Sequence, residues 1–192
     1  MALKTGHKVL IGVGIFIVLV ALWAMVSYNG LVSADETINE KWANVQSAYQ
    51  RRADLIPNLV ATVKQYTNYE GDVLTKITEA RASVGKASNP QELAAAGQQM
   101  DSALSRLLVV AENYPDLKAN ENYLSLQDEL AGTENRVKVE RDLFNKAVKE
   151  FNIKVRRFPT SIMASWGGFE TKQSFEAQAG SETAPDVGAM FE

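Results

Sequence analysis

The sequence predicts an all-α protein, with an N-terminal transmembrane helix followed by a long antiparallel helical bundle of three to four helices. Three observations support this fold class. Residues 9–34 form a run of 26 residues without a charge. Beyond this run, apolar residues recur in steps of three and four, which is typical of helices packed side by side. No stretch shows the strict alternation of apolar and polar residues that indicates a strand.

The first predicted element is a transmembrane helix over residues 9–28, after a short basic flank at residues 1–8. Residues 9–26 are apolar throughout and would span about 27 Å as a helix, close to the bilayer's hydrocarbon thickness of about 30 Å. The alternative is a cleaved export signal, because residues 32–34 resemble a small-residue cleavage site. The run exceeds the roughly 7–15 apolar residues of a signal, so we expect a retained, single-pass anchor.

The charges beside the span suggest its orientation. Lys4 and Lys8 precede it, whereas the acidic Asp35 and Glu36 follow it. Positive residues favour the cytoplasmic side, so we expect a protein of the cell (inner) membrane with its bundle on the extracytoplasmic or periplasmic side. A cytoplasmic bundle is the alternative. In either orientation the lipid bilayer is an expected partner.

The predicted bundle occupies residues 29–169, and its first helix carries a long apolar stripe. The stripe comprises Ile38, Trp42, Val45, Tyr49, Ile56, Leu59, Val63, Tyr66, Val73 and Ile77. Its register passes through Pro57, although an interior proline usually kinks or breaks a helix. The unbroken register favours one kinked helix reaching about Gly85 over two helices that meet near Pro57.

Capping residues and prolines delimit the remaining bundle helices. Asn89 is a predicted N-cap with Pro90 at the first helical position and Glu92 closing a capping box. A turn is expected at residues 114–115, followed by a long helix over about residues 119–157 that Pro159 terminates. Residues 170–192 are rich in Ser, Gly, Ala, Glu and Pro, so we expect them to form a flexible tail.

Composition excludes several classes of function. Only Lys4 and Lys8 are charged before Asp35, so the remaining body has 18 basic and 23 acidic groups and a formal charge of −5. Nucleic acid is therefore not an expected partner. Cysteine is absent, and His7 is the single histidine. With no G-x-S-x-G, HExxH or P-loop motif, we expect no catalytic residue, metal site or cofactor.

One candidate contact segment surrounds Pro57. The heptad repeat places Arg52 on the inward stripe and Arg51 outside it, with Glu70 and Arg81 inward further along. Buried charges need partners, so these residues are expected to form internal ion pairs that fix the register of the bundle. The alternative is a polar contact site for a partner or a second copy. That site would comprise Arg51, Arg52, Asp54, Pro57 and Asn58.

Two further segments could contribute to function. Polar residues on the second and third bundle helices could form a layer between them: Ser105, Arg106, Glu112, Glu134, Asn135 and Arg136. After the last long helix, an apolar segment follows the basic Lys154, Arg156 and Arg157. It either folds over the end of the bundle and buries its large side chains, or lies in the membrane interface. The candidate interface residues are Phe158, Ile162, Trp166 and Phe169.

Several stretches together resemble the LemA family of bacterial membrane proteins. They are Arg51-Arg52 with residues 54–60, residues 103–108, residues 114–120 and residues 132–136. The resemblance implies a single N-terminal anchor and a long antiparallel helical bundle, without an established enzymatic activity, cofactor or ligand. A relative in magnetosome formation implies roles in membrane organisation or assembly.

We therefore expect a non-enzymatic, membrane-anchored helical scaffold. The heptad spacing suggests coiled-coil packing and a homo-oligomer, with protein partners that the sequence does not identify. The alternative is a membrane-tethered sensor that binds a ligand between its helices and responds to envelope signals.

Overall fold

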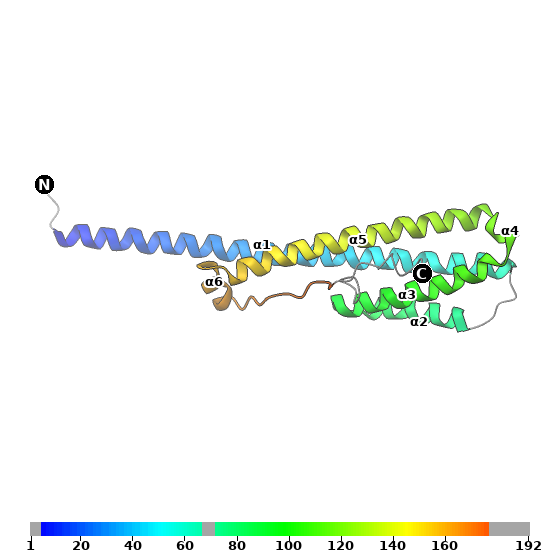
Figure 1. Cartoon of the computed structure of the whole chain (residues 1–192). Coiled ribbons are helices and arrows are strands. Elements are labelled where there is room, and N and C mark those ends of the chain that lie inside the picture. The colour runs from blue at the N-terminus through cyan, green and yellow to red at the C-terminus, as the bar shows by residue number, and fades with distance from the viewer. Residues whose placement is uncertain (1–4, 67–71, 177–192) are drawn as a thin grey trace, which may run out of the picture. The chain divides into compact units, whose positions relative to one another are not determined.

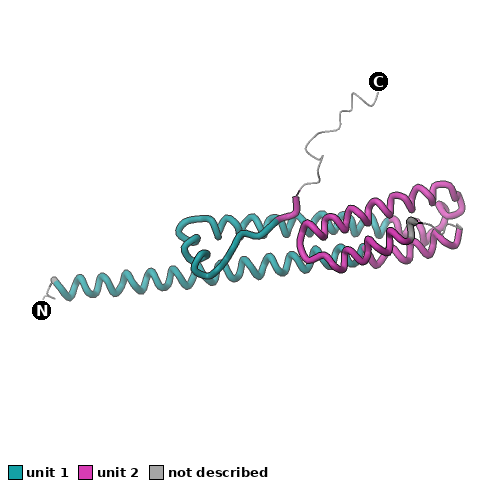
Figure 2. The backbone as a smooth tube through the Cα atoms, turned by 90° about the horizontal axis from the view of Figure 1, so that it is seen from below, with its two compact units in different colours: residues 1–52, 128–173 teal, residues 53–127, 174–192 magenta. Residues whose placement is uncertain are grey.

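A computed structural model describes residues 5–66 and 72–176, which contain six helices and no strand (Figure 1). This confirms the predicted all-α class and is consistent with a helical bundle. The helices are α1 (Thr5–Tyr66), α2 (Asp72–Lys86), α3 (Pro90–Glu112), α4 (Pro115–Lys118), α5 (Glu121–Arg156) and α6 (Thr160–Trp166). Contacts divide the chain into two compact units (Figure 2). Unit 1 comprises Met1–Arg52 and Asp128–Gln173, and unit 2 comprises Ala53–Gln127 and Ser174–Glu192.

Helix α1 begins with the predicted membrane span. The most apolar 18-residue window of α1 has none of its residues buried by the protein. Its large side chains, from Val9 to Val26, are exposed, and burial begins only at Leu31, which is fully inaccessible. Exposed apolar side chains of this length and composition need an apolar environment outside the protein. Within the part of the chain that the structure describes, α1 is the one helix that is long and apolar enough to cross a membrane.

The path of α1 confirms one prediction and corrects another. The helix continues through Pro57, as the unbroken register predicted, but it ends at Tyr66 rather than near Gly85. In a single helix the 27 residues between Asp54 and Arg81 would span about 40 Å. Instead, the Arg81 guanidinium lies 3.5 Å from the Asp54 carboxylate, so α2 folds back against α1. The stripe continued across the reversal because α2 also buries a face with the same spacing, at Ile77, Ala80 and Val84.

Unit 2 is built from the end of α1, the α2 and α3 hairpin, α4 and the beginning of α5. The Asn89 side chain accepts a hydrogen bond from the Glu92 N–H at 2.9 Å, which confirms the predicted N-cap of α3. Asn120 caps α5 by accepting from the Tyr123 N–H at 3.0 Å, and it donates to the Tyr66 hydroxyl at 2.9 Å. This second bond ties the start of α5 to the end of α1.

Unit 1 pairs α1 with α5 in antiparallel directions. Trp42 of α1 packs against Phe144 of α5 with ring centroids 5.6 Å apart, and further along α1 the Arg52 side chain meets Glu134, which precedes Phe144 in α5. Helix α5 ends at Arg156, two residues before Phe158, as the proline signal predicted. After α6 the chain returns along the pair, where the Lys172 ammonium lies 2.9 Å from the Asp35 carboxylate.

Candidate functional site

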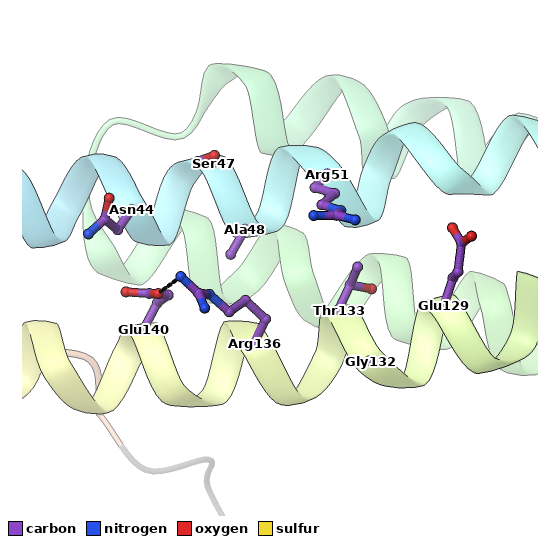
Figure 3. Close-up of a pocket in the computed structure, with 9 residues that line it drawn as sticks. All are labelled: Asn44, Ser47, Ala48, Arg51, Glu129, Gly132, Thr133, Arg136 and Glu140. Atoms are coloured by element: carbon purple, nitrogen blue, oxygen red, sulfur yellow. Dashed lines mark ion pairs between the residues drawn. The ribbon is translucent and has the colours of Figure 1, made fainter.

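A cavity of about 530 Å³ lies between α1 and α5 of unit 1 (Figure 3). Helix α1 contributes Asn44, Ser47, Ala48 and Arg51, and helix α5 contributes Glu129, Gly132, Thr133, Arg136 and Glu140. The small Ala48 and Gly132 face it from opposite helices, and a Cβ atom at Gly132 would meet no other atom within 4 Å. The space thus exists because two small residues leave it between charged and hydroxyl-bearing neighbours.

Glu140 contributes a buried carboxylate to the lining of this cavity. Its side chain is only 5% exposed, and Oε1 forms an ion pair with Arg136 Nη2 at 2.7 Å. The other carboxylate oxygen, Oε2, is buried and makes no hydrogen bond within the described residues. An unsatisfied buried acceptor of this kind costs about 1–3 kcal/mol. One oxygen of this carboxylate is therefore paired with Arg136, and the other has no hydrogen bond.

The sequence analysis missed Glu140, although a signal was present. Thr133, Val137, Glu140 and Phe144 follow one another at steps of four, three and four, and all four are buried. Glu134, which the sequence analysis named in a polar layer between helices, is instead half exposed.

The residues predicted around Pro57 make different contacts within the two units. Arg52 is buried, as the repeat predicted, and its guanidinium lies 3.7 Å from the Glu134 carboxylate, whereas Arg51 is exposed and lines the cavity. Both arginines belong to unit 1. Asp54, Pro57 and Asn58 belong to unit 2, where Asp54 pairs with Arg81. Arg52 and Arg81 thus both have carboxylate partners, but the pairs are not internal, since Glu134 and Asp54 are 48% and 56% exposed. Glu70 and the side chain of Val73 lie outside the described residues.

The polar layer predicted between the second and third bundle helices is replaced by other pairings. Ser105 donates to the Asp101 carbonyl of its own helix at 2.9 Å. Glu134 pairs with Arg52 of α1, and Arg136 pairs with Glu140 of α5. All six residues of the predicted layer are exposed, so the expectation that they lie between two helices is wrong.

The apolar segment after α5 divides into exposed and packed side chains. Phe158, Ile162 and Trp166 are 76%, 56% and 79% exposed. Phe169 instead packs edge-on against Tyr28 and Phe151, with ring centroids 5.7 and 6.3 Å apart. The expectation that the segment buries Ile162 and Trp166 is wrong. These two lie one helical turn apart, whereas Ala164 between them takes the buried position of α6.

Two side chains of unit 2, Glu92 and Tyr123, have pKa values that their surroundings shift in opposite directions. The pKa of Glu92 is lowered because its carboxylate accepts from the Ser88 N–H at 2.8 Å and from the Ser88 hydroxyl at 2.9 Å. Burial raises the pKa of Tyr123, and the charge of Glu112 adds to that shift. Over the described ranges, no three His, Asp or Glu side chains are grouped to hold a metal ion.

Comparisons with known proteins give a consistent result. The model of the LemA family matches residues 41–188. Magnetosome protein MamQ 2 of Paramagnetospirillum magneticum is 22% identical over 194 residues, covering 88% of this chain and 71% of that protein. Protein LemA of Metamycoplasma hominis is 29% identical over 140 residues, covering 71% of this chain and 63% of that protein. Magnetosome protein MamQ of Magnetospirillum gryphiswaldense is 21% identical over 185 residues, covering 83% and 68%.

Proposed function

The chain belongs to the LemA family, and we propose that it is a non-enzymatic, membrane-anchored helical scaffold that self-associates and organises membrane or partner proteins. The observation that carries this proposal is the continuity of α1. A single helix of 62 residues contains the exposed apolar span and continues into the stretch that packs against α5 in unit 1. The α1 and α5 pair is therefore joined to the span without a loop, as suits a support placed at a membrane.

The comparisons favour assembly over catalysis. LemA is not known as an enzyme family, and two of the relatives are named magnetosome proteins. From these relatives we infer that this chain has a role in organising a membrane. The bundle is proposed to lie on the extracytoplasmic side of the inner membrane because Lys4 and Lys8 precede the span and acidic residues follow it.

The cavity of unit 1 supports the self-association part of the proposal. Two antiparallel helices expose a hollow at Ala48 and Gly132, and close approach of another helix requires small residues of this kind. The Glu140 carboxylate belongs to the cavity lining, and its Oε2 atom lacks a hydrogen bond although it is buried from solvent. Residues of a second copy are the proposed occupants.

Size and crosslinking measurements test this proposal. The full chain in detergent is expected to contain more than one copy by light scattering, and to crosslink to itself in intact membranes. Gly132→Leu should reduce both signals because it adds a large side chain to the cavity lining at a position where a Cβ meets open space, and leucine is the better helix former by about 1 kcal/mol. Gly85→Leu is the matched control, since a Cβ at Gly85 also meets open space. A monomer in both measurements contradicts self-association.

The same cavity supports a second candidate, a sensor that binds a small polar ligand. Its volume of about 530 Å³ falls in the range of small-molecule sites, and its lining carries Arg51, Arg136, Glu129 and Glu140. A ligand of the folded state raises the melting temperature. Screening charged metabolites by thermal shift tests this candidate, with Gly132→Leu expected to abolish the shift. A screen in which the Gly132→Leu variant responds like the natural protein contradicts binding in this cavity.

A further inference from the structure

We propose that Phe158 and the following helix α6 form an interfacial foot, in which Phe158, Ile162 and Trp166 insert into the headgroup region of an anionic bilayer beside the end of the membrane span. This inference deepens the proposed function and rests on its membrane anchor. It assigns a lipid surface to a face of unit 1 that the protein leaves uncovered.

The first argument is the position of α6 relative to the span. Residues 9–28 of α1 would cover about 30 Å, so the headgroup layer begins near Tyr28. The Phe169 ring lies against the Tyr28 ring, and α6 ends only three residues before Phe169, at Trp166. All these residues belong to unit 1. The short helix is therefore held at the level where α1 leaves the hydrocarbon (Figure 1).

The second argument is the chemistry of the exposed face. Two aromatic rings and an isoleucine are exposed on a segment of about nine residues, which begins directly after the exposed Arg156 and Arg157. Aromatic side chains favour the interface between water and lipid, and adjacent basic residues favour anionic headgroups. Ala164 turns the opposite side of α6 toward the protein. This combination fits a lipid surface.

The third argument is the close packing that positions α6. A Cβ atom at Gly167 would lie 2.8 Å from the Phe169 ring and 3.1 Å from the Tyr28 ring. Gly167 has a φ of −83°, so space rather than backbone conformation requires glycine there. Past Phe169, the Asn152 side chain accepts from the Lys172 N–H at 2.8 Å and donates to the Lys172 carbonyl at 2.9 Å. Both contacts hold the segment against α1 and α5.

Tryptophan fluorescence of the full chain in vesicles tests the proposal. The vesicles contain phosphatidylcholine and phosphatidylglycerol with brominated acyl chains, which quench nearby indoles. The double variant Trp23→Phe, Trp42→Phe leaves Trp166 as the single tryptophan. Its emission is expected to be quenched at least twofold by brominated lipid and protected from iodide in the water. Quenching by iodide with no effect of brominated lipid overturns the proposal.

Two further single-tryptophan backgrounds separate the possible failures. Trp42 lies 14 residues beyond Tyr28, about 21 Å along α1, and should resist brominated lipid. Trp23 lies within the span and should be quenched. If Trp23 is quenched and Trp166 is not, the foot is wrong while the anchor stands. If neither is quenched, the anchor itself is wrong. Protection of Trp166 from both quenchers would assign this face to a second copy and overturn the lipid contact.

A positioning variant tests the role of the glycine. Gly167→Leu in the background with Trp166 alone should displace Phe169 and reduce the quenching by brominated lipid toward that of Trp42. Gly85→Leu is its control, because it also replaces a helical or near-helical glycine by leucine, meets open space and belongs to unit 2. Equal quenching of Trp166 in the two variants contradicts the claim that packing at Gly167 positions the foot.

Discussion

Two charged side chains, Arg52 and Glu140, are buried among the apolar residues of unit 1. Arg52 was predictable because the α1 stripe is regular enough to place a charge inside it. Glu140 occupies the equivalent place on α5, but the apolar residues of α5 are sparser, so their spacing did not single it out. Pairing was not predictable for either residue, since helical spacing fixes the face of a side chain and leaves its partner open.

Arg52 is expected to matter more for folding than its neighbour. Arg52→Leu removes a buried guanidinium and its pair with Glu134, at a cost of about 1–2 kcal/mol. Arg51→Leu changes an exposed side chain and should shift the free energy of unfolding by less than about 0.5 kcal/mol. Chemical denaturation of the full chain in detergent, followed by circular dichroism, measures both. Equal midpoints for the two variants would remove this prediction.

Glu140 is expected to oppose stability. Glu140→Leu removes a buried carboxylate oxygen that lacks a hydrogen bond, while its partner Arg136 is 68% exposed and remains solvated. The variant should unfold with about 1 kcal/mol more free energy than the natural protein and should self-associate less. Glu129→Leu, at an exposed position of the same cavity, is the control. Destabilisation by Glu140→Leu would make the carboxylate a structural group.

At the scale of elements, helix ends were predicted better than helix partners. The start of α3 was predicted from Asn89, Pro90 and Glu92, and the end of α5 was predicted from Pro159. Both predictions were possible because helix capping and termination depend on residues close together in the sequence. The reversal between α1 and α2 was missed. The apolar spacing continued across it, and that spacing alone predicted one helix reaching about Gly85.

The cap of α3 gives a prediction for stability. Asn89→Ala removes the acceptor of the Glu92 N–H and should cost about 1 kcal/mol. Asn113→Ala is a suitable comparison, because Asn113 follows α3 at its other end and its side chain makes only a long bond of 3.4 Å to Val109. Thermal unfolding should show a smaller loss for Asn113→Ala. The reverse order would contradict the cap as the stronger stabiliser.

The same cap gives a pH dependence. The pKa of Glu92 is lowered in the folded state by its bonds to Ser88, so the carboxylate stabilises the protein above its ordinary pKa. That contribution is lost as the pH falls through the lowered value. The Glu92→Gln variant should lose stability near neutral pH and should converge with the natural protein in acid. Melting curves across this range measure the difference, and a constant offset at every pH would contradict it.

At the scale of the whole molecule, the sequence predicted the helical class, the apolar span and the family, because each depends on patterns that extend over many residues. It did not predict the division into two units or the cavity of unit 1. Both depend on contacts between residues far apart in the sequence, such as Arg52 with Glu134 and Asp54 with Arg81.

The prediction for the whole molecule concerns the side of the membrane on which the helical bundle lies. A reporter enzyme that is active only outside the cytoplasm, fused after Glu192, is expected to be active. A reporter fused before Met1 should be inactive. Replacing Lys4 and Lys8 by glutamate should reduce the difference, because positive residues favour the cytoplasmic side. Activity of the N-terminal fusion alone would reverse the proposed arrangement.

Helix α1 continues without interruption from its exposed apolar turns to the inaccessible Leu31. Its length therefore sets both the rotation and the height of unit 1 beyond Leu31 relative to the membrane span. One extra residue placed between Tyr28 and Leu31 would turn everything beyond it by about 100° and advance it by about 1.5 Å. Seven extra residues would restore the original facing while lengthening the stem by about 10 Å. The two insertions therefore vary rotation about the helix axis and height above the lipid separately. Comparing the two variants shows which of these quantities the protein's function depends on.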